Sequence, residues 1–237
     1  MSRNESEARA ADPLVDAYSG YKGLPPLAGL HTIREAVTVG LSVTDSVTRL
    51  KRLHWSFRRL HEIFVARITS MPIYEIKMAF SLHAYYCAEN VESMSSRVRE
   101  MRQPPYGLEV SPDAALEALF DEVLAAPTTE SLVLGLYEIA VPAVTRALEN
   151  MVRDTNRLFD HISYHICRLA LVGWRDVEQY GREAVRCLVD EEHRNELKDW
   201  SADLQAMLEA SGDLDGSQEP SGKDVRRRFS LTPYKYD

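Results

Sequence analysis

Polar side chains interrupt the apolar face of a predicted helix over 75–102, and their types could support acid–base chemistry. His83 and Asn90 recur at three- and four-residue steps among apolar residues, so both are expected to point inward. Glu89 lies beside that row, in the pattern H-x5-E. An imidazole whose pKa is tuned by burial and by a neighbouring carboxylate can act as a general acid or base. Tyr86 could line a pocket next to these residues or pack between helices.

A second predicted helix places two more imidazoles in an apolar row. From Ser42 to Ile68 the sequence has one continuous apolar stripe, and His54 and His61 lie one turn before and after Phe57 within it. A single inward histidine is more often a hydrogen-bonded core residue than a catalyst, because buried polar groups normally find partners. Several on facing helices favour a shared site.

The last long helix, over 161–188, supplies the third set. His165, Asp176 and Gln179 share a face, with Glu178 next to Gln179. If the three faces converge, they form one chamber inside the bundle that binds and transforms a small organic molecule. The predicted catalytic residues are His61, His83, Glu89 and Glu178, and the predicted substrate-binding residues are His54, Phe57, Tyr86, Asn90, His165 and Gln179.

A metal site is the alternative use of the same residues. Imidazole and carboxylate ligands suit iron or manganese, and Glu89, Glu178, His83 and Glu138 are the candidate ligands. Glu138 could equally be an exposed helix charge. The cofactor is therefore either absent or iron or manganese.

The elements that would position these residues are long amphipathic helices. Pro72 ends the first helix, and Pro104 and Pro105 end the second, since proline lacks an amide donor. Thr128 or Thr129 could cap a third helix that Pro142 kinks or breaks, and Asp160 could cap the fourth. The predicted ranges are 42–71 with a possible earlier start at Thr32, 75–102, 111–126 with Pro112 in its first turn, 130–154, and 161–188 with a possible extension to 208.

Four long helices with a short helix in the crossover between the second and third match an all-α four-helix bundle with one long connection. The predicted domain organisation is an N-terminal arm over 1–35, a bundle over 36–210 and a flexible tail over 211–237. The tail mixes basic and aromatic residues, and could fold back over the bundle or dock on a second subunit. A homodimer is possible if one apolar edge of the bundle stays exposed.

Composition excludes several classes of protein. The net charge of −8 over 237 residues argues against nucleic-acid binding, because no basic face is large enough to neutralise a run of phosphates. No signal peptide is visible, and no stretch approaches the roughly 20 apolar residues of a membrane span. Three dispersed cysteines indicate reduced thiols. These features predict a cytoplasmic protein that does not bind membranes.

Three segments resemble a branch of the ferritin-like superfamily, the four-helix bundles that carry di-iron carboxylate sites. They are LHWSFRRL, EIKMAFSLHAYYCAENVESMSSRVREMRQPPYGLEV and NRLFDHISYHICRLALVGWRDVEQYGREA. The resemblance covers roughly residues 40–190. It implies a di-metal site with ligands from all four helices.

The ligand pattern departs from that family at three positions. Phe57 stands where the first helix should supply a glutamate, Asn90 follows Glu89 where a histidine should stand, and Gln179 replaces a histidine on the last helix. Phenylalanine cannot bind a metal, and neutral amides are poor ligands for divalent iron. The resemblance therefore predicts a lost or altered metal site.

Three functions follow from these observations. The first is a biosynthetic enzyme, descended from ferritin-like oxidases, that transforms a small molecule in the bundle interior. The second is a di-iron or di-manganese oxidase or oxygenase with unusual ligands. The third is a non-catalytic binding or scaffold protein, such as a partner of another enzyme.

Overall fold

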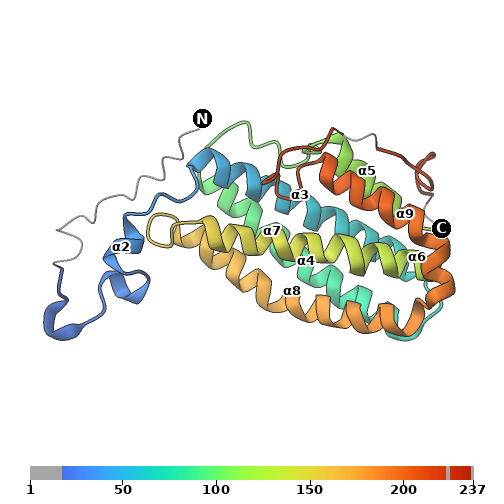
Figure 1. Ribbon diagram of the computed structural model, residues 1–237, viewed down its shortest axis with the longest axis horizontal. Helices are drawn as coiled ribbons and strands as arrows, with labels where there is room; N and C mark the ends of the chain where they lie inside the picture. Colours follow the sequence, from blue (N-terminus) through green and yellow to red (C-terminus); the bar gives the residue numbers. More distant parts are fainter. Residues whose placement is uncertain (1–17, 223–224, 236–237) are drawn as a thin grey trace, which may run out of the picture.

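The computed structural model describes residues 18–222 and 225–235, and within these ranges the chain is all-helical, without strands (Figure 1). The predicted all-α class is therefore confirmed. The elements are η1 (Tyr21–Gly23), η2 (Leu27–Gly29), α2 (Ile33–Ala36), α3 (Val43–Ile68), α4 (Tyr74–Glu100), α5 (Ala114–Leu124), α6 (Thr129–Leu134), η3 (Gly135–Ala140), α7 (Val141–Asp154), α8 (His161–Leu188) and α9 (Glu191–Ala210).

Local capping explains where the helices begin. Ser42 accepts a hydrogen bond from the amide of Asp45 at the start of α3, and Asp160 accepts one from Ser163 at the start of α8. The Asp160 cap is the one that the sequence predicts for this helix. The prediction for α5 is wrong in detail, because Asp113 is its cap and Pro112 lies before the helix.

The third long helical segment is continuous from Thr129 to Asp154, although Pro142 lies inside it. Proline cannot donate to the carbonyl four residues earlier, and its ring would collide with that carbonyl. Just before Pro142 the chain forms the wider π-helical segment η3. This segment accommodates the proline, and the predicted break does not occur. The helical segment from Thr129 to Asp154 has the length and apolarity of a membrane span, but 83% of its most apolar window is buried inside the protein, as in a core helix.

The last predicted helix ends earlier than its possible extension to 208. After Leu188 the chain leaves helical geometry, and Asp190 caps a separate helix, α9, through the amide of His193. Asp190, Glu191 and Glu192 are all exposed to solvent. In the structure they form the N-terminal turn of α9, where negative charge interacts favourably with the helix dipole.

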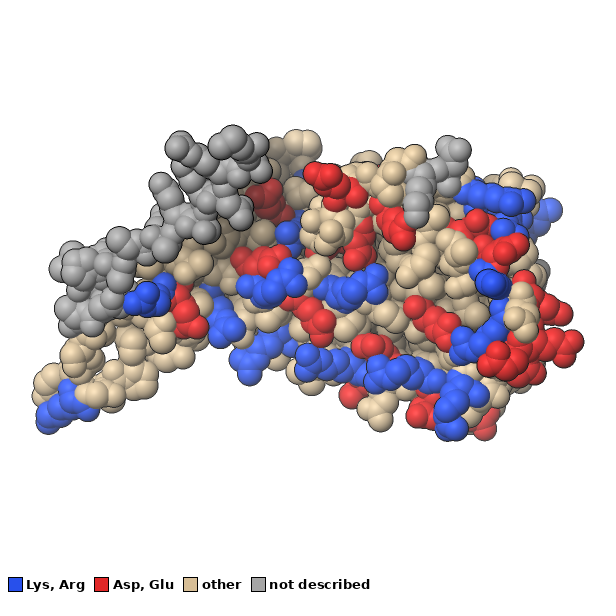
Figure 2. Space-filling model, in the orientation of Figure 1, with Lys and Arg blue, Asp and Glu red and all other residues tan. Residues whose placement is uncertain are grey.

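Helices α3, α4, α8 and the α6–α7 segment form the bundle, and α5 and α9 pack on its outside (Figure 1). Neighbouring long helices are antiparallel. Arg49 near the start of α3 bonds Asp154 at the end of α7, and Arg97 near the end of α4 bonds Asp160 before α8. Positive and negative side chains are interspersed over the face shown in Figure 2, as expected for a surface with many ion pairs.

The C-terminal segment folds back onto the bundle in the described residues. Arg52 on α3 donates to the carbonyls of Ser211, Asp213 and Leu214, which holds the turn after α9 against α3. Further on, Phe229 packs against Trp200 of α9, with ring centroids 5.4 Å apart. Of the two predicted alternatives for the tail, folding back over the bundle is therefore the one observed for these residues.

This segment converges on one buried carboxylate, that of Glu122 on α5, which has no exposed surface. Its oxygens accept hydrogen bonds from the Trp200 indole at 2.9 Å and from the Ser230 hydroxyl at 2.6 Å. The backbone amides of Arg228, Phe229 and Ser230 also donate to it. Burial raises the pKa of Glu122, but these hydrogen bonds outweigh it, so the pKa lies below its ordinary value.

Candidate functional site

The centre of the bundle is filled by aromatic side chains. Phe57 of α3 and Trp174 of α8 are both fully buried and meet edge to face, with centroids 4.9 Å apart. The Trp174 indole donates to the carbonyl of Val141 at 3.2 Å, so its polar atom is satisfied. Phe57 is thus a core residue. The predicted polar chamber does not form around it.

The two other predicted residues on α3 do not meet a common site. His54 is buried, and its Nδ1 has no hydrogen-bond partner among the described residues. Burial lowers the pKa of His54 to about 4, with smaller contributions from the positive charges of Arg58 and Arg99. His61 is half-buried and has no hydrogen-bond or ion-pair partner in the described part of the chain.

His83 on α4 has a defined polar environment. Its Nδ1 lies 3.0 Å from the hydroxyl of Tyr137, which is itself buried in η3. Burial lowers the pKa of His83 to about 4 and raises that of Tyr137 well above its ordinary value, so both groups are neutral near pH 7. Gly181 on α8 allows this arrangement, since a Cβ there would lie 2.4 Å from the Tyr137 ring.

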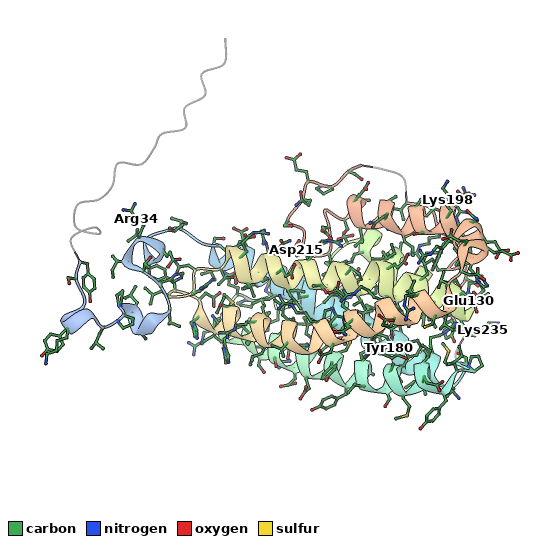
Figure 3. All side chains as sticks on the ribbon, turned by 60° about the horizontal axis from the view of Figure 1, so that its bottom comes forward. Arg34, Glu130, Tyr180, Lys198, Asp215 and Lys235 are labelled. Carbon is green, nitrogen blue, oxygen red and sulfur yellow. The ribbon has the colours of Figure 1, made fainter. Side chains whose placement is uncertain are left out.

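His83 forms part of the floor of a surface groove between α4 and α8. The groove has a volume of about 470 Å³. Tyr180, which is labelled on α8 in Figure 3, lines the groove and donates to the backbone carbonyl of Glu75 at 3.1 Å. The lining residues are Glu75, Met78, Ala79, Leu82, His83, Tyr86, Asp176, Val177 and Tyr180.

A second hollow of about 500 Å³ lies between the same two helices and shares Tyr86 and Asp176 with the first. Its lining includes Glu89 and Asn90, so four predicted residues, His83, Tyr86, Glu89 and Asn90, do meet along one surface. Gly173 and Ala170 of α8 line this hollow with small residues, which leaves room between the two helices. We use "α4–α8 groove" for the two connected hollows.

Glu89 and Asn90 have their own local partners in this groove. The Tyr85 hydroxyl donates to Glu89 at 2.6 Å, and the Asn90 amide donates to the backbone carbonyl of Tyr86 at 2.8 Å. Glu89 is exposed and Asn90 is half-buried. The carboxylate therefore belongs to the rim of the groove and does not contact His83 through any hydrogen bond in the described residues.

The predicted residues of α8 lie outside the bundle core. The face that carries His165 and Gln179 points to solvent, and Leu169 and Val172 on it are 57% and 65% exposed. Glu178 is half-buried on the other side, where it accepts from Thr145 at 3.1 Å and Arg182 at 2.9 Å. The spacing predicts one inward face that carries these residues, but α8 has apolar residues on two faces, and the buried one is the other.

The four candidate metal ligands do not converge. Glu138 is exposed and pairs with Arg194 at 2.8 Å, while Glu178 and His83 have the partners given above. Within the described residues, no group of three or more His, Cys, Asp or Glu side chains is placed to hold a metal ion. The residues therefore do not fit iron or manganese, and we derive no chemistry through either.

Sequence reasoning missed Tyr137, Tyr180 and the apolar groove wall. A signal for the wall was present: Met78, Leu82 and Tyr86 recur at four-residue steps on α4, and they form a second stripe beside the buried one. Tyr137 had no such signal, because its role depends on meeting His83 across the bundle.

Comparison with known proteins adds no family, since no family model, curated protein or solved structure matches the chain. The resemblance to the ferritin-like superfamily stays a prediction. The function has to be argued from the α4–α8 groove itself.

Proposed function

We propose that this protein binds a small, mainly apolar organic molecule in the α4–α8 groove, with the body of the molecule over His83. The observation that carries the proposal is the apolar hollow between α4 and α8. Its volume of about 470 Å³ lies in the range of small-molecule sites, roughly 300–1,000 Å³.

The groove leaves apolar side chains in water that a ligand would cover. Met78 is 55% exposed and Leu82 is 50% exposed, and both line the hollow. Covering apolar surface contributes roughly 25 cal/mol per Å², so even 100 Å² on the protein side favours binding by about 2.5 kcal/mol. A mainly apolar ligand therefore suits this wall.

The polar groups of the groove favour binding over chemistry. His83 has a pKa of about 4, which makes it a weak base near pH 7. Burial holds the pKa of the Cys87 thiol well above its ordinary value, so this sulfur is not a nucleophile. Transformation of the ligand, with His83 as the base, is the second candidate. The His83–Tyr137 contact supports it, and loss of turnover in His83→Phe would test it.

We further propose that the scaffold is a ferritin-like four-helix bundle. The order of the long helices, the short helix α5 in the connection between α4 and α6, and the antiparallel packing of neighbouring helices support this assignment. It makes no claim on metal chemistry, since one scaffold carries many functions.

The binding proposal can be tested with the neutral fluorophore N-phenyl-1-naphthylamine, whose emission rises in apolar surroundings. We expect saturable binding to one site per chain, weakened at least tenfold in the double variant Met78→Ser, Leu82→Ser. Val65→Ser is the matched control, because Val65 is 48% exposed on α3 and does not line the groove. Equal weakening in both variants would contradict the assignment.

Light scattering on the same samples identifies a competing occupant. If a second copy of the chain covers the groove, the measured mass is twice that of one chain, and Leu169→Ser with Val172→Ser reduces it. We expect the mass of one chain and probe binding that does not depend on protein concentration. A dimer that excludes the probe would overturn the proposal.

A further inference from the structure

The charged residues that line the α4–α8 groove are all acidic. Glu75 and Asp176 line the first hollow, and Glu89 and Asp176 line the second. Among the described residues, no lysine or arginine lines either hollow. The apolar floor is therefore bordered by carboxylates of one sign.

These three carboxylates have no ion-pair partner within residues 18–222 and 225–235. Glu89 accepts a hydrogen bond from Tyr85, and the side chains of Glu75 and Asp176 have no partner there. Two arginines of α8 pair elsewhere. Arg182 contacts Glu178 at 2.9 Å and Arg175 approaches Glu149 on α7 at 3.7 Å. Within the described residues, no ion pair therefore compensates the three carboxylates of the groove.

Aromatic rings add to this preference for positive charge. Tyr86 lies in both hollows and Tyr180 in the first. The face of an aromatic ring carries partial negative charge and attracts ammonium groups within about 6 Å. His83 does not oppose a cation, since burial keeps it neutral near pH 7.

We infer that the ligand of the α4–α8 groove is an organic cation, an apolar body that carries a protonated amine or a quaternary ammonium group. This inference rests on the proposed function. The apolar body covers Met78, Leu82 and Val177, and the ammonium group lies toward Glu75 and Asp176 at the rim. Charge complementarity and the tyrosine faces select the cation, while the apolar wall supplies most of the contact area.

The test compares three probes that share one body: 4-phenylbutylamine, 4-phenylbutan-1-ol and 4-phenylbutanoate. Each is titrated against the full chain by displacement of N-phenyl-1-naphthylamine at pH 7 and low salt. We expect the amine to bind about tenfold more tightly than the alcohol, and the anion to bind most weakly. The advantage of the amine should shrink in 0.5 M salt, because exposed charges are screened.

Substitutions of Glu75 and Asp176 test whether these rim carboxylates cause the preference for the amine. Glu75→Gln combined with Asp176→Asn should bring the amine to the affinity of the alcohol and leave the alcohol unchanged. Glu196→Gln, an exposed carboxylate on α9 outside the groove, should change neither. Both rim residues are exposed, so folding is not at risk.

The possible failures separate the two claims. Equal binding of all three probes, or tighter binding of the anion, would overturn the inference and leave apolar binding in the groove intact. Failure of every probe, including the neutral fluorophore, would overturn the proposed function and the inference together.

Discussion

On the α5–α9 side of the bundle, the chain's own C-terminal segment fills the space between two helices, whereas no described residue covers the groove between α4 and α8. The buried carboxylate of Glu122 accepts hydrogen bonds from five donors: the Trp200 indole, the Ser230 hydroxyl and the backbone amides of 228–230. The carboxylates of Glu75 and Asp176 accept none from the part of the chain that the structure describes. Polar groups on the first side therefore stabilise the fold, and those on the second remain available to a ligand.

The largest expected effect on stability is on the α5–α9 side, where the C-terminal segment covers the bundle. Glu122→Ala removes the acceptor of the Trp200 indole and of three backbone amides at a position without exposed surface. We expect a loss of about 4 kcal/mol in the free energy of unfolding, measured by urea denaturation. Glu117→Ala, an exposed position on the same helix, should cost less than about 0.5 kcal/mol. Similar losses in both variants would mean that the tail contacts do not stabilise the fold.

The two sides should also differ in their response to pH. Burial lowers the pKa of His83 from 6.5 to about 4, so the unfolded chain binds a proton that the folded chain does not between these values. The contribution of His83 to the free energy of unfolding is therefore fully present above pH 6.5. It falls by up to about 3 kcal/mol as the pH is lowered toward 4. Glu122, whose folded pKa is depressed, contributes above about pH 4.5 and loses its contribution only below that value.

Unfolding measured at pH 7, 6, 5 and 4.5 checks this difference. His83→Phe should flatten the decline between pH 6.5 and 4.5, even though it lowers stability at pH 7 by leaving the Tyr137 hydroxyl without its partner. His54→Leu should flatten it too, and should cost little at pH 7, because Nδ1 of His54 has no hydrogen-bond partner in the described residues. An unchanged slope in both variants would show that neither imidazole is held neutral.

A smaller effect is expected at the tail itself. Ser230→Ala removes one hydroxyl donor to Glu122 and leaves the backbone amides in place. A hydrogen bond to a charged group contributes roughly 1.5–3 kcal/mol, and we expect the lower end because Ser230 is half-buried. Hydrogen exchange at the amides of 228–230 should accelerate accordingly. Thr232→Ala, at an exposed position, is the control, and equal exchange in both would contradict the arrangement.

The smallest effect on stability should come from substitutions in the α4–α8 groove. Leu82→Ser at the groove wall should change the free energy of unfolding by less than about 0.5 kcal/mol, since the side chain is already 50% exposed. The buried Leu60→Ala should cost about 2–5 kcal/mol. A large loss for Leu82→Ser in thermal or urea unfolding would mean that this wall is covered in solution.

Sequence periodicity was a reliable guide to the helices and a poor one to which face of α8 is buried. His165, Leu169, Val172 and Gln179 do recur at helical spacing, but they lie on the solvent side. The buried side carries Cys167, Leu171 and Trp174. A helix that borders an apolar groove has two apolar faces, and periodicity alone cannot distinguish between them.

The position of His83 on an apolar stripe correctly predicted that it is buried, but not which side chain it contacts. His83 is buried as the spacing predicts, yet its partner is Tyr137 and not Glu89. Glu89 lies about 100° further round the helix from the buried row, so it reaches the rim. The likeness to a ligand pattern therefore overstated how closely these two side chains approach.

The sequence by itself determined the helices and most of their ends, because spacing, caps and prolines act within a few residues. Asp160 caps its helix as predicted, and Thr128 is one of the two residues predicted to cap the third long helix. Only the tertiary structure decided which polar groups meet. The rotation of each helix about its axis places Phe57 against Trp174 in the centre and His83 under a groove, and the return of the chain places Ser230 on Glu122, 108 residues away. Such contacts depend on packing between distant segments, which local sequence patterns do not encode.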